Sequence, residues 1–447
     1  MELIDQAVAL HRAGMLTEAE VLYRRILVFD SGNFDAQHML GVILAQRQKF
    51  EGAERLIRAA LLIDASSGPC LHNYGNVLAK LGRHLESLGF YDRALTALPD
   101  DASIHSDRGS TLKELGRLDE AFSSFSQALD IDPDFADAHL NLGVCHLLRG
   151  EYERGWQEYE WRWKTDGMPS PEPIVQARLW LGQADIAGKT ILLRAEQGLG
   201  DAIQFCRYAK LLAAKGATIV LEVARPLKYL LTGLQGVERV LAAGEQLPTD
   251  IDYYCPLLSL PLAFNTRIDT IPATGPYLNA SQDLIKKWSE RLGQKQRQRV
   301  GIAWSGSSTN VHGRHRSLTL DRFLPLRDLG LQLVSLQTDL TDCDRKILAE
   351  HQDIMHFGVG FSDTAALVSL MDIVISVDTS VAHLAGALGA PTWVLLPHVP
   401  DWRWLMDRED SPWYPTVRLF RQSTIGDWDG VLQNITNELA FMMKIRN

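Results

Sequence analysis

One stretch of the sequence, residues 375–386, combines residue types that suit an anion-binding site. It reads Ile-Ser-Val-Asp-Thr-Ser-Val-Ala-His-Leu-Ala-Gly. An apolar strand is predicted to end at Asp378, and a helix to begin at once with Thr379 or Ser380 as its cap. The free N–H groups and the dipole of such a helix favour a phosphate, to which His383 in the first turn can donate. An ordinary capped turn with a core histidine would show the same pattern, so both interpretations stay open.

A second polar segment is the loop at 305–316, which is predicted to follow another buried strand. It contains Ser305, Gly306, Arg314 and Arg316. Hydroxyls, glycines and arginines suit a diphosphate that becomes a leaving group, because a guanidinium can stabilise its growing charge. A solvated basic loop would have a similar composition, and this alternative is kept.

Further candidates follow the same logic at other strand and helix ends. Gln337 at a predicted strand end, and Asp363 with Thr364 at a predicted helix start, are expected to line the site for a base and ribose; caps or turns are the equal alternative at both places. His312 and His315 stand at HxxH spacing but lack a nearby carboxylate or Cys partner, so no metal site is predicted.

The elements that must position these residues alternate between short apolar runs and amphipathic segments. Strands are predicted at 190–194, 218–223, 237–241, 252–256, 300–304, 333–337, 373–377, 392–396 and 417–420. Helices are predicted between them, at 201–214, from Pro226, and at 320–329, 363–371, 381–389 and 428–443. This alternation indicates two Rossmann-like halves with the ligand at the carboxyl ends of the strands, in the cleft between them.

The first third of the chain carries an internal repeat of a different kind. Gly41, Gly75, Gly109 and Gly143 recur every 34 residues, and an aromatic or aliphatic series (Tyr23, Ile57, Tyr91, Phe125, Tyr159) keeps the same period. This is the signature of tetratricopeptide (TPR) repeats, which are helix–turn–helix units that stack into a solenoid. The concave face of such a solenoid commonly holds a peptide or a partner element; a purely structural spacer is the alternative.

These patterns divide the chain into five parts. They are a TPR solenoid at 1–165, a connecting segment at 166–189, a first lobe at 190–285, a basic, solvated helical linker at 286–299 and a second lobe at 300–447. The predicted fold class is therefore α + α/β. The aromatic run Gly155–Trp163 at the end of the solenoid is interpreted as a packing surface for the next domain, since its exposure would be unfavourable.

The second part of the chain, about 175–440, resembles the glycosyltransferases of family 9, the ADP-heptose:lipopolysaccharide heptosyltransferases. The resemblance rests on 372–397, on Leu193-Arg194 with 198–201, and on 301–304 with 316–318. It is closer still to bacterial proteins that fuse TPR repeats to such a domain. It implies a GT-B fold with the acceptor on the first lobe, the nucleotide-sugar donor on the second lobe, and no required metal or other cofactor.

The resemblance also implies a role for Asp201. Gly200-Asp201 is similar to the Gly-Asp of heptosyltransferases, whose aspartate is the general base of an inverting transfer. Asp201 would also suit a helix cap, so that alternative remains, and Glu196 in the same loop is a second candidate base. Many heptosyltransferases carry a Lys in the 305–316 loop, where this chain has Arg314 and Arg316. Arg316 is expected to act in catalysis together with Asp201.

The composition limits the classes of function. The chain has 447 residues and a net charge of −10; residues 1–164 account for −8 and residues 165–447 for −2. An acidic chain without a basic stripe disfavours a nucleic-acid partner. The absence of a long apolar run and of a basic, apolar leader predicts a protein without an integral membrane segment. Five dispersed Cys residues without a CxxC pair indicate reduced thiols and a cytoplasmic location.

Three functional hypotheses follow. The first is a metal-independent glycosyltransferase whose repeats recruit a protein acceptor, with flagellin as the acceptor that bacterial fusions of this kind suggest. The second is a heptosyltransferase-type enzyme of lipopolysaccharide or polysaccharide assembly. The third is a non-catalytic TPR interaction scaffold with a degenerate second half; the presence of Asp201, Asp378 and His383 counts against it.

Overall fold

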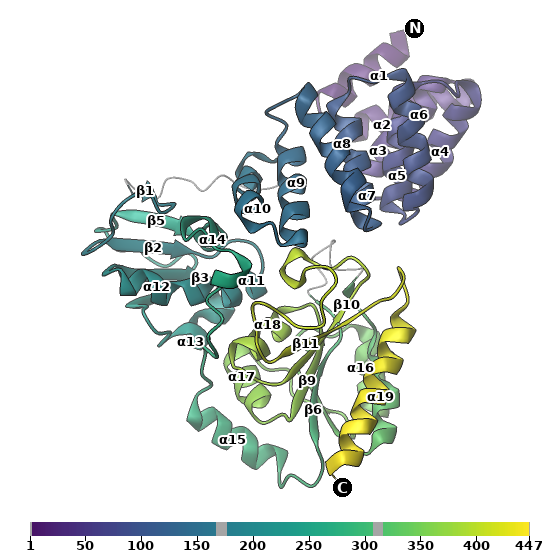
Figure 1. Ribbon diagram of the computed structural model, residues 1–447. Helices are drawn as coiled ribbons and strands as arrows, with labels where there is room; N and C mark the ends of the chain where they lie inside the picture. The colour runs from purple at the N-terminus through teal and green to yellow at the C-terminus, as the bar shows by residue number, and fades with distance from the viewer. Residues whose placement is uncertain (1, 167–176, 307–315, 447) are drawn as a thin grey trace. The chain divides into compact units, whose positions relative to one another are not determined.

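A computed structural model describes residues 2–166, 177–306 and 316–446 (Figure 1). The chain forms two compact units, Met1–Cys145 and His146–Asn447. No helix within the described ranges is both long enough and apolar enough to cross a bilayer.

The first unit is an all-helical solenoid of antiparallel pairs, as the 34-residue period predicts. Its helices are α1 (Glu2–Arg12), α2 (Leu16–Phe29), α3 (Phe34–Gln46), α4 (Phe50–Ile63), α5 (Gly68–Lys80), α6 (His84–Ala97), α7 (Ala102–Glu114) and α8 (Leu118–Ile131). The repeated glycine allows the helices of a pair to approach closely. A Cβ atom on Gly75 would lie 2.6 Å from the Tyr91 ring, and one on Gly109 would lie 2.7 Å from the Phe125 ring.

Helix α9 (Ala136–Arg149) begins in the first unit and ends in the second, which also contains α10 (Tyr152–Tyr159) and the 3₁₀ helix η1 (Glu160–Lys164). The predicted solenoid range of 1–165 thus includes helices that pack inside the second unit. Trp156 is 2% exposed and donates its indole N–H to the backbone oxygen of Thr266, at 2.9 Å. Tyr152 accepts from the indole N–H of Trp413 at 3.2 Å. The aromatic run therefore packs into this unit.

Two all-parallel sheets form the rest of the second unit. The first has the order β1 (Arg178–Leu179), β5 (Tyr253–Pro256), β2 (Thr190–Arg194), β3 (Thr218–Val223) and β4 (Arg239–Ala242). The second has the order β11 (Val417–Arg421), β10 (Thr392–Leu396), β9 (Ile373–Val377), β6 (Arg299–Ala303), β7 (Gln332–Ser335) and β8 (Met355–His356). Numbered along the chain, the second sheet has the order 3-2-1-4-5-6 of doubly wound nucleotide-binding folds.

In both sheets the order in which the chain adds strands reverses beside one strand, and a predicted site segment directly follows that strand. In the second sheet β6 lies between β7 and β9, and in the first β2 lies between β3 and β5. Ligands of open α/β sheets bind at such switch points, beyond the carboxyl ends of the strands.

Helices and 3₁₀ turns connect these strands. They include α11 (Leu199–Phe205), η2 (Cys206–Tyr208), α12 (Ala209–Ala214), η3 (Arg225–Leu227), α13 (Lys228–Leu231), α14 (Leu260–Ala263), α15 (Gln282–Leu292), η7 (Leu320–Leu329), α16 (Asp342–Glu350), α17 (Phe361–Ser369), α18 (Ser380–Ala387), η8 (Trp402–Trp404) and α19 (Trp428–Arg446). The core of the second sheet includes Ile302, Ile375 and Leu395 from three adjacent strands, together with Ile435 of α19.

The structure corrects several element predictions. The segment 320–329 is a 3₁₀ helix instead of an α-helix, and Pro325 within it lacks the N–H that an α-helix would need. The single helix predicted at 201–214 is interrupted by η2, where Arg207 donates its side chain to the Gln204 carbonyl at 2.7 Å. The basic segment predicted as a solvated helical linker does include a helix, α15, but one face of that helix is buried, since its Trp288 is 1% exposed.

Candidate functional site

A cleft of about 810 Å³ in the second unit lies where the carboxyl ends of both sheets meet. Nine of the predicted site residues line it: Asp201, Ser305, Gly306, Arg316, Gln337, Asp378, Thr379, Ser380 and His383. The tenth, Arg314, lies outside the described residues. Residues as far apart in the sequence as Asp201 and His383 thus share one cavity.

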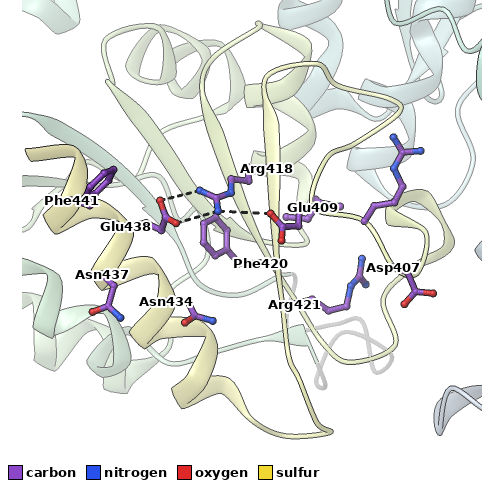
Figure 2. A pocket seen from close by; sticks show the side chains of 11 residues that line it. Asp407, Glu409, Arg418, Phe420, Arg421, Asn434, Asn437, Glu438 and Phe441 are labelled. Carbon is purple, nitrogen blue, oxygen red and sulfur yellow. Dashed lines mark hydrogen bonds and ion pairs between the residues drawn. The ribbon is translucent and has the colours of Figure 1, made fainter. Parts of the chain in front are cut away.

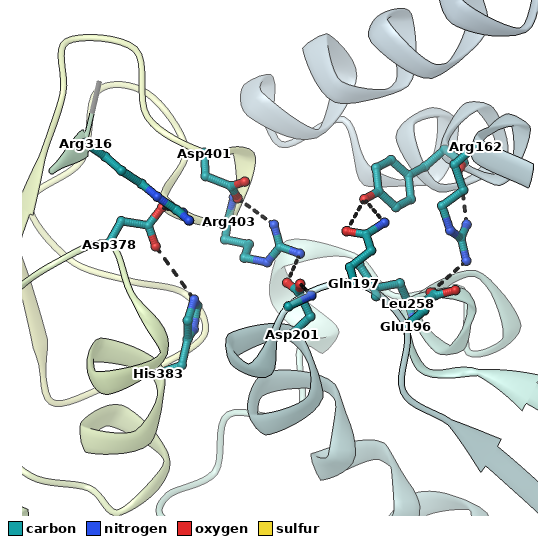
Figure 3. Close-up of polar contacts among 12 residues, drawn as sticks. Arg162, Glu196, Gln197, Asp201, Leu258, Arg316, Asp378, His383, Asp401 and Arg403 are labelled. Atoms are coloured by element: carbon teal, nitrogen blue, oxygen red, sulfur yellow. Dashed lines mark hydrogen bonds and ion pairs between the residues drawn. The ribbon is translucent and has the colours of Figure 1, made fainter. Parts of the chain in front are cut away.

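Asp201 comes from the loop after β2 and is the third residue of α11. Its Oδ2 accepts the backbone N–H of Gly198 at 2.8 Å, so the carboxylate does cap its own helix. Its Oδ1 accepts from the guanidinium of Arg403, which belongs to the second lobe (Figure 3). Burial raises the pKa of Asp201 above its usual value, although Arg403 opposes that shift. Asp201 therefore caps its own helix and lines the cleft at the same time.

Sequence reasoning missed Asp401 and Arg403, which line the same cleft. Arg403 is 6% exposed, and its Nη1 donates to Oδ1 of Asp401 at 2.7 Å. Its guanidinium carbon lies 4.1 Å from the centre of the Trp402 ring. Burial opposes the charge of Arg403, but Asp201 and Asp401 together raise its pKa. The available signal was the Asp-Trp-Arg-Trp run (401–404) shortly after a predicted buried strand.

Asp378 and Arg316 form a second ion pair in the cleft. Nη1 of Arg316 lies 2.9 Å from Oδ2 of Asp378, whose side chain is 4% exposed. Although burial opposes the charge, Asp378 raises the pKa of Arg316. Both guanidinium groups that line the described part of the cleft are thus already paired with carboxylates.

His383 lies on α18, which directly follows β9. Its Nδ1 is 2.9 Å from the hydroxyl of Tyr414, and its ring stacks on Trp404. Its Nε2 is 3.8 Å from Oδ1 of Asp378 (Figure 3). Burial, with a further contribution from Arg403, lowers the pKa of His383 to about 3. The imidazole is therefore neutral at ordinary pH and can serve as a hydrogen-bonding group but not as a cation.

The start of α18 is capped by Thr379, whose hydroxyl accepts the N–H of Val381 at 3.2 Å. This settles which of the two predicted residues caps the helix. Ser380, the first helical residue, also lines the cleft. Gly200 on the opposite wall lies very near, because a Cβ atom there would be 2.8 Å from the His383 ring.

Gln337 organises the turn after β6. Its amide oxygen accepts the N–H groups of Trp304 and Ser305 at 3.1 and 3.2 Å, and its amide nitrogen donates to Ser305 O at 2.9 Å. Gln337 thus holds the beginning of the 305–316 loop. Asp363, in contrast, accepts the indole N–H of Trp288 at 2.7 Å and is engaged by α15.

Glu196, the second candidate base, points into a different environment. Its Oε1 accepts from Arg162 at 3.0 Å and from the backbone N–H of Leu258 at 3.1 Å (Figure 3). Burial raises the pKa of Glu196 to about 7; Arg162 opposes this shift and Glu160 adds to it. The neighbouring Gln197, with φ of +57°, is the residue of this loop that lines the cleft beside Gly198 and Asp201.

A second pocket of about 770 Å³ lies at the outer edge of the second sheet, between β11, α19 and residues 407–409 (Figure 2). Arg418 lies 3.1 Å from Glu438 and 3.9 Å from Glu409 there. The described lining of this pocket carries charges of both signs, so it indicates no particular class of ligand. Over the described residues, no group of three His, Cys, Asp or Glu side chains is arranged to hold a metal ion.

Comparison with known proteins supports the assignment of the helical repeats. Residues 109–150 match the TPR repeat family. The first unit is a TPR-type solenoid, a class of fold that serves protein–protein interaction. The sequence prediction of TPR repeats is thus confirmed.

One curated relative is Protein FlbA of Caulobacter vibrioides, which is 25% identical over 323 residues. The match covers 66% of this chain and 53% of that protein, so the chain spans about half the length of its relative. Among solved structures, the chain is similar to YrrB, described as a TPR protein with an unusual peptide-binding site (25% identity, TM-score 0.33, 38% of this chain and 87% of that one). It is also similar to MamA from Desulfovibrio magneticus RS-1 (17% identity, TM-score 0.34, 37% and 95%).

Proposed function

We propose that the second unit is a glycosyltransferase with a GT-B arrangement of its two lobes, which moves a sugar from a nucleotide-sugar to an acceptor hydroxyl. The observation that carries this proposal is the shared cleft. Asp201 follows the switch strand β2 of one sheet, and Ser305, Asp378 and His383 follow the switch strands β6 and β9 of the other.

In the proposed reaction the acceptor hydroxyl attacks the anomeric carbon while its proton passes to the Asp201 carboxylate. The bond between the anomeric carbon and the phosphate oxygen breaks at the same time, and the nucleotide leaves with the bonding electrons. This single displacement inverts the anomeric configuration. A buried carboxylate with a raised pKa is a stronger base than a carboxylate in water.

The second lobe supplies groups for the departing phosphate. Arg316 donates charge-assisted hydrogen bonds, the N-terminus of α18 presents backbone N–H groups, and neutral His383 adds a further hydrogen-bonding site. This chemistry uses side chains and a helix end instead of a metal, so we expect EDTA to leave the transfer rate unchanged.

We further propose that the solenoid recruits a protein acceptor, with flagellin as the candidate. The repeats support an interaction role, and the net charge of −8 in residues 1–164 suits a partner with basic or polar segments. Co-expression with flagellin tests this: sugar should be detected on flagellin only when this protein is present. Sugar on an oligosaccharide acceptor instead would favour the polysaccharide-assembly alternative.

The substitution Asp201→Asn tests the chemistry. A thermal-shift screen with ADP-, UDP-, GDP- and CMP-sugars first identifies the donor. We expect Asp201→Asn to reduce transfer by about 10²- to 10⁴-fold while donor binding persists, because the amide cannot take the proton. Unchanged transfer with intact donor binding would contradict the assignment of the base.

Asp344→Asn is the matched control. Asp344 is also the third residue of a helix and accepts the N–H of its cap residue Thr341 at 2.9 Å. It does not line the described part of the cleft. Its substitution should lower stability through the lost cap and leave transfer near the wild-type rate.

A further inference from the structure

Arg403 has an unusual position because its one guanidinium serves two carboxylates in the cleft. Nη2 donates to Asp201 of the first lobe, and Nη1 donates to Asp401 of its own lobe. Its Nε is buried and has no hydrogen-bond partner among the described residues. The side chain is thus held firmly, and one of its donors is unused.

We infer that Arg403 is a positioning residue that changes partner during the reaction. It holds the Asp201 carboxylate in the free protein and turns to the phosphates of the donor when the donor binds, so that Asp201 becomes available as the base. This inference rests on the proposed function.

The charges in the cleft explain why such an exchange is needed. Four carboxylates, Asp201, Asp339, Asp378 and Asp401, face two guanidinium groups among the described lining residues. Within this described lining, an incoming phosphate can reach a guanidinium only by displacing a carboxylate from it. An arginine stays charged and can bind phosphate through two parallel hydrogen bonds, so it can exchange one anion for another.

Arg403 is better suited to this exchange than Arg316. Oδ1 of Asp401 accepts from Nη1 of Arg403 at 2.7 Å and so anchors one edge of the guanidinium. The same oxygen also accepts the backbone N–H of Arg403 at 3.0 Å. The Asp201 contact can then be lost without releasing the side chain. Loss of that contact removes the main positive charge beside Asp201 and increases its affinity for a proton only when a donor is present.

A thermodynamic cycle measured by calorimetry with inorganic pyrophosphate tests the exchange. The four proteins are the wild type, Asp201→Asn, Arg403→Gln and the double variant, each as the full chain. We expect Asp201→Asn to bind pyrophosphate about fivefold tighter or more, since Arg403 no longer has to leave a carboxylate. Arg403→Gln should bind more weakly than the wild type, and in that background Asp201→Asn should tighten binding only by the small amount that the loss of one cleft charge causes.

Asp339→Asn is the control for charge alone. Asp339 lines the same cleft, and its substitution removes the same charge. Any tightening that it causes should persist in the Arg403→Gln background, because it acts through long-range electrostatics. If Arg403→Gln does not fold, Arg403→Lys replaces it in the cycle; we expect a reduced coupling there, since an ammonium group cannot hold both carboxylates in the same geometry.

Three results would overturn the inference: equal tightening by Asp201→Asn with and without Arg403, wild-type affinity in the Arg403 variant, or no pyrophosphate binding by the wild type. Different results would contradict the proposed function. If no nucleotide-sugar supports transfer but the cycle shows coupling, the exchange stands without the glycosyltransferase. If transfer depends on Asp201 but the coupling is absent, the glycosyltransferase stands without the exchange.

Discussion

At the scale of single residues, two carboxylates of one loop have different environments although they lie only five positions apart. Asp201 lines the cleft and is paired with Arg403, whereas Glu196 points toward Arg162 and the backbone of Leu258. Both have a raised pKa, and burial is the main cause in each case. A raised pKa alone does not identify the proposed base; of the two carboxylates, only Asp201 lines the cleft.

Glu196 gives the stability of the protein a defined pH dependence. Its pKa is about 7 in the folded protein and near 4.5 in the unfolded chain. Between these values the folded protein holds more protons, so this residue makes the free energy of unfolding fall as pH rises from 4.5 to 7. The slope is at most about 1.4 kcal/mol per pH unit.

We therefore expect Glu196→Gln to show a flatter decrease in stability over this pH range than the wild type, as measured by urea unfolding at several pH values. Glu238→Gln, at an exposed position, removes the same charge and should follow the wild-type profile. A Glu196→Gln profile parallel to that of the wild type would contradict the raised pKa.

At the scale of elements, the cleft depends on two helix N-termini that approach each other from different lobes. Helix α11 follows β2 in the first lobe, and α18 follows β9 in the second. Gly200 at the start of α11 is near both His383 and the Cα of Ser380. The His383 ring cannot move aside easily, because it is held by Tyr414 and stacks on Trp404.

Gly200→Ala tests this approach. The added methyl group would lie 2.8 Å from the His383 ring, so the two helices must separate or the ring must shift. We expect a loss of about 1–3 kcal/mol in stability and a reduced transfer rate.

Gly89→Ala is the control, because it lies on an exposed helix position with no atom within 4 Å of the added Cβ. It should stabilise the protein by about 0.5–1 kcal/mol. Thermal unfolding and transfer assays measure both variants, and equal behaviour of the two would refute the close contact.

At the scale of the whole molecule, the end of the helical region belongs structurally to the second unit. Trp156 and Tyr159 are 2% and 6% exposed, and both rings lie against Trp402, the neighbour of Arg403. Arg162 is 1% exposed and holds Glu196. The second unit therefore needs this segment to complete its core.

Two truncations distinguish the contributions of the helices. A fragment that begins at Asp134 keeps α9, α10 and η1, and we expect it to fold cooperatively and to bind the donor as the full chain does. A fragment that begins at Lys164 loses Tyr152, Trp156 and Tyr159, whose burial stabilises the unit by several kcal/mol, so it should unfold or melt at a much lower temperature. Circular dichroism and calorimetry measure both, and equal stability of the two fragments would contradict the assignment. The longer fragment should also lose transfer to a protein acceptor if the repeats recruit it.

Features that depend on local periodicity could be predicted from the sequence. The 34-residue spacing predicted the solenoid, and apolar runs predicted the strands β2, β3, β9 and β10 with their bounds as found. The two-residue strands β1 and β8 were missed because they are too short to show a period, and α16 was missed because it is rich in charged residues.

Which polar residues come into contact depends on the tertiary packing and could not be predicted. Sequence reasoning could place Asp201, Asp378 and His383 at element ends, because capping and strand termination are local properties. It could not predict that Arg403 contacts Asp201, which is 202 positions away. It also could not predict that Glu196 points toward Arg162 instead of the cleft. Those contacts depend on how two separate sheets pack, and packing is fixed by the fit of buried side chains from distant parts of the chain, for which no local pattern exists.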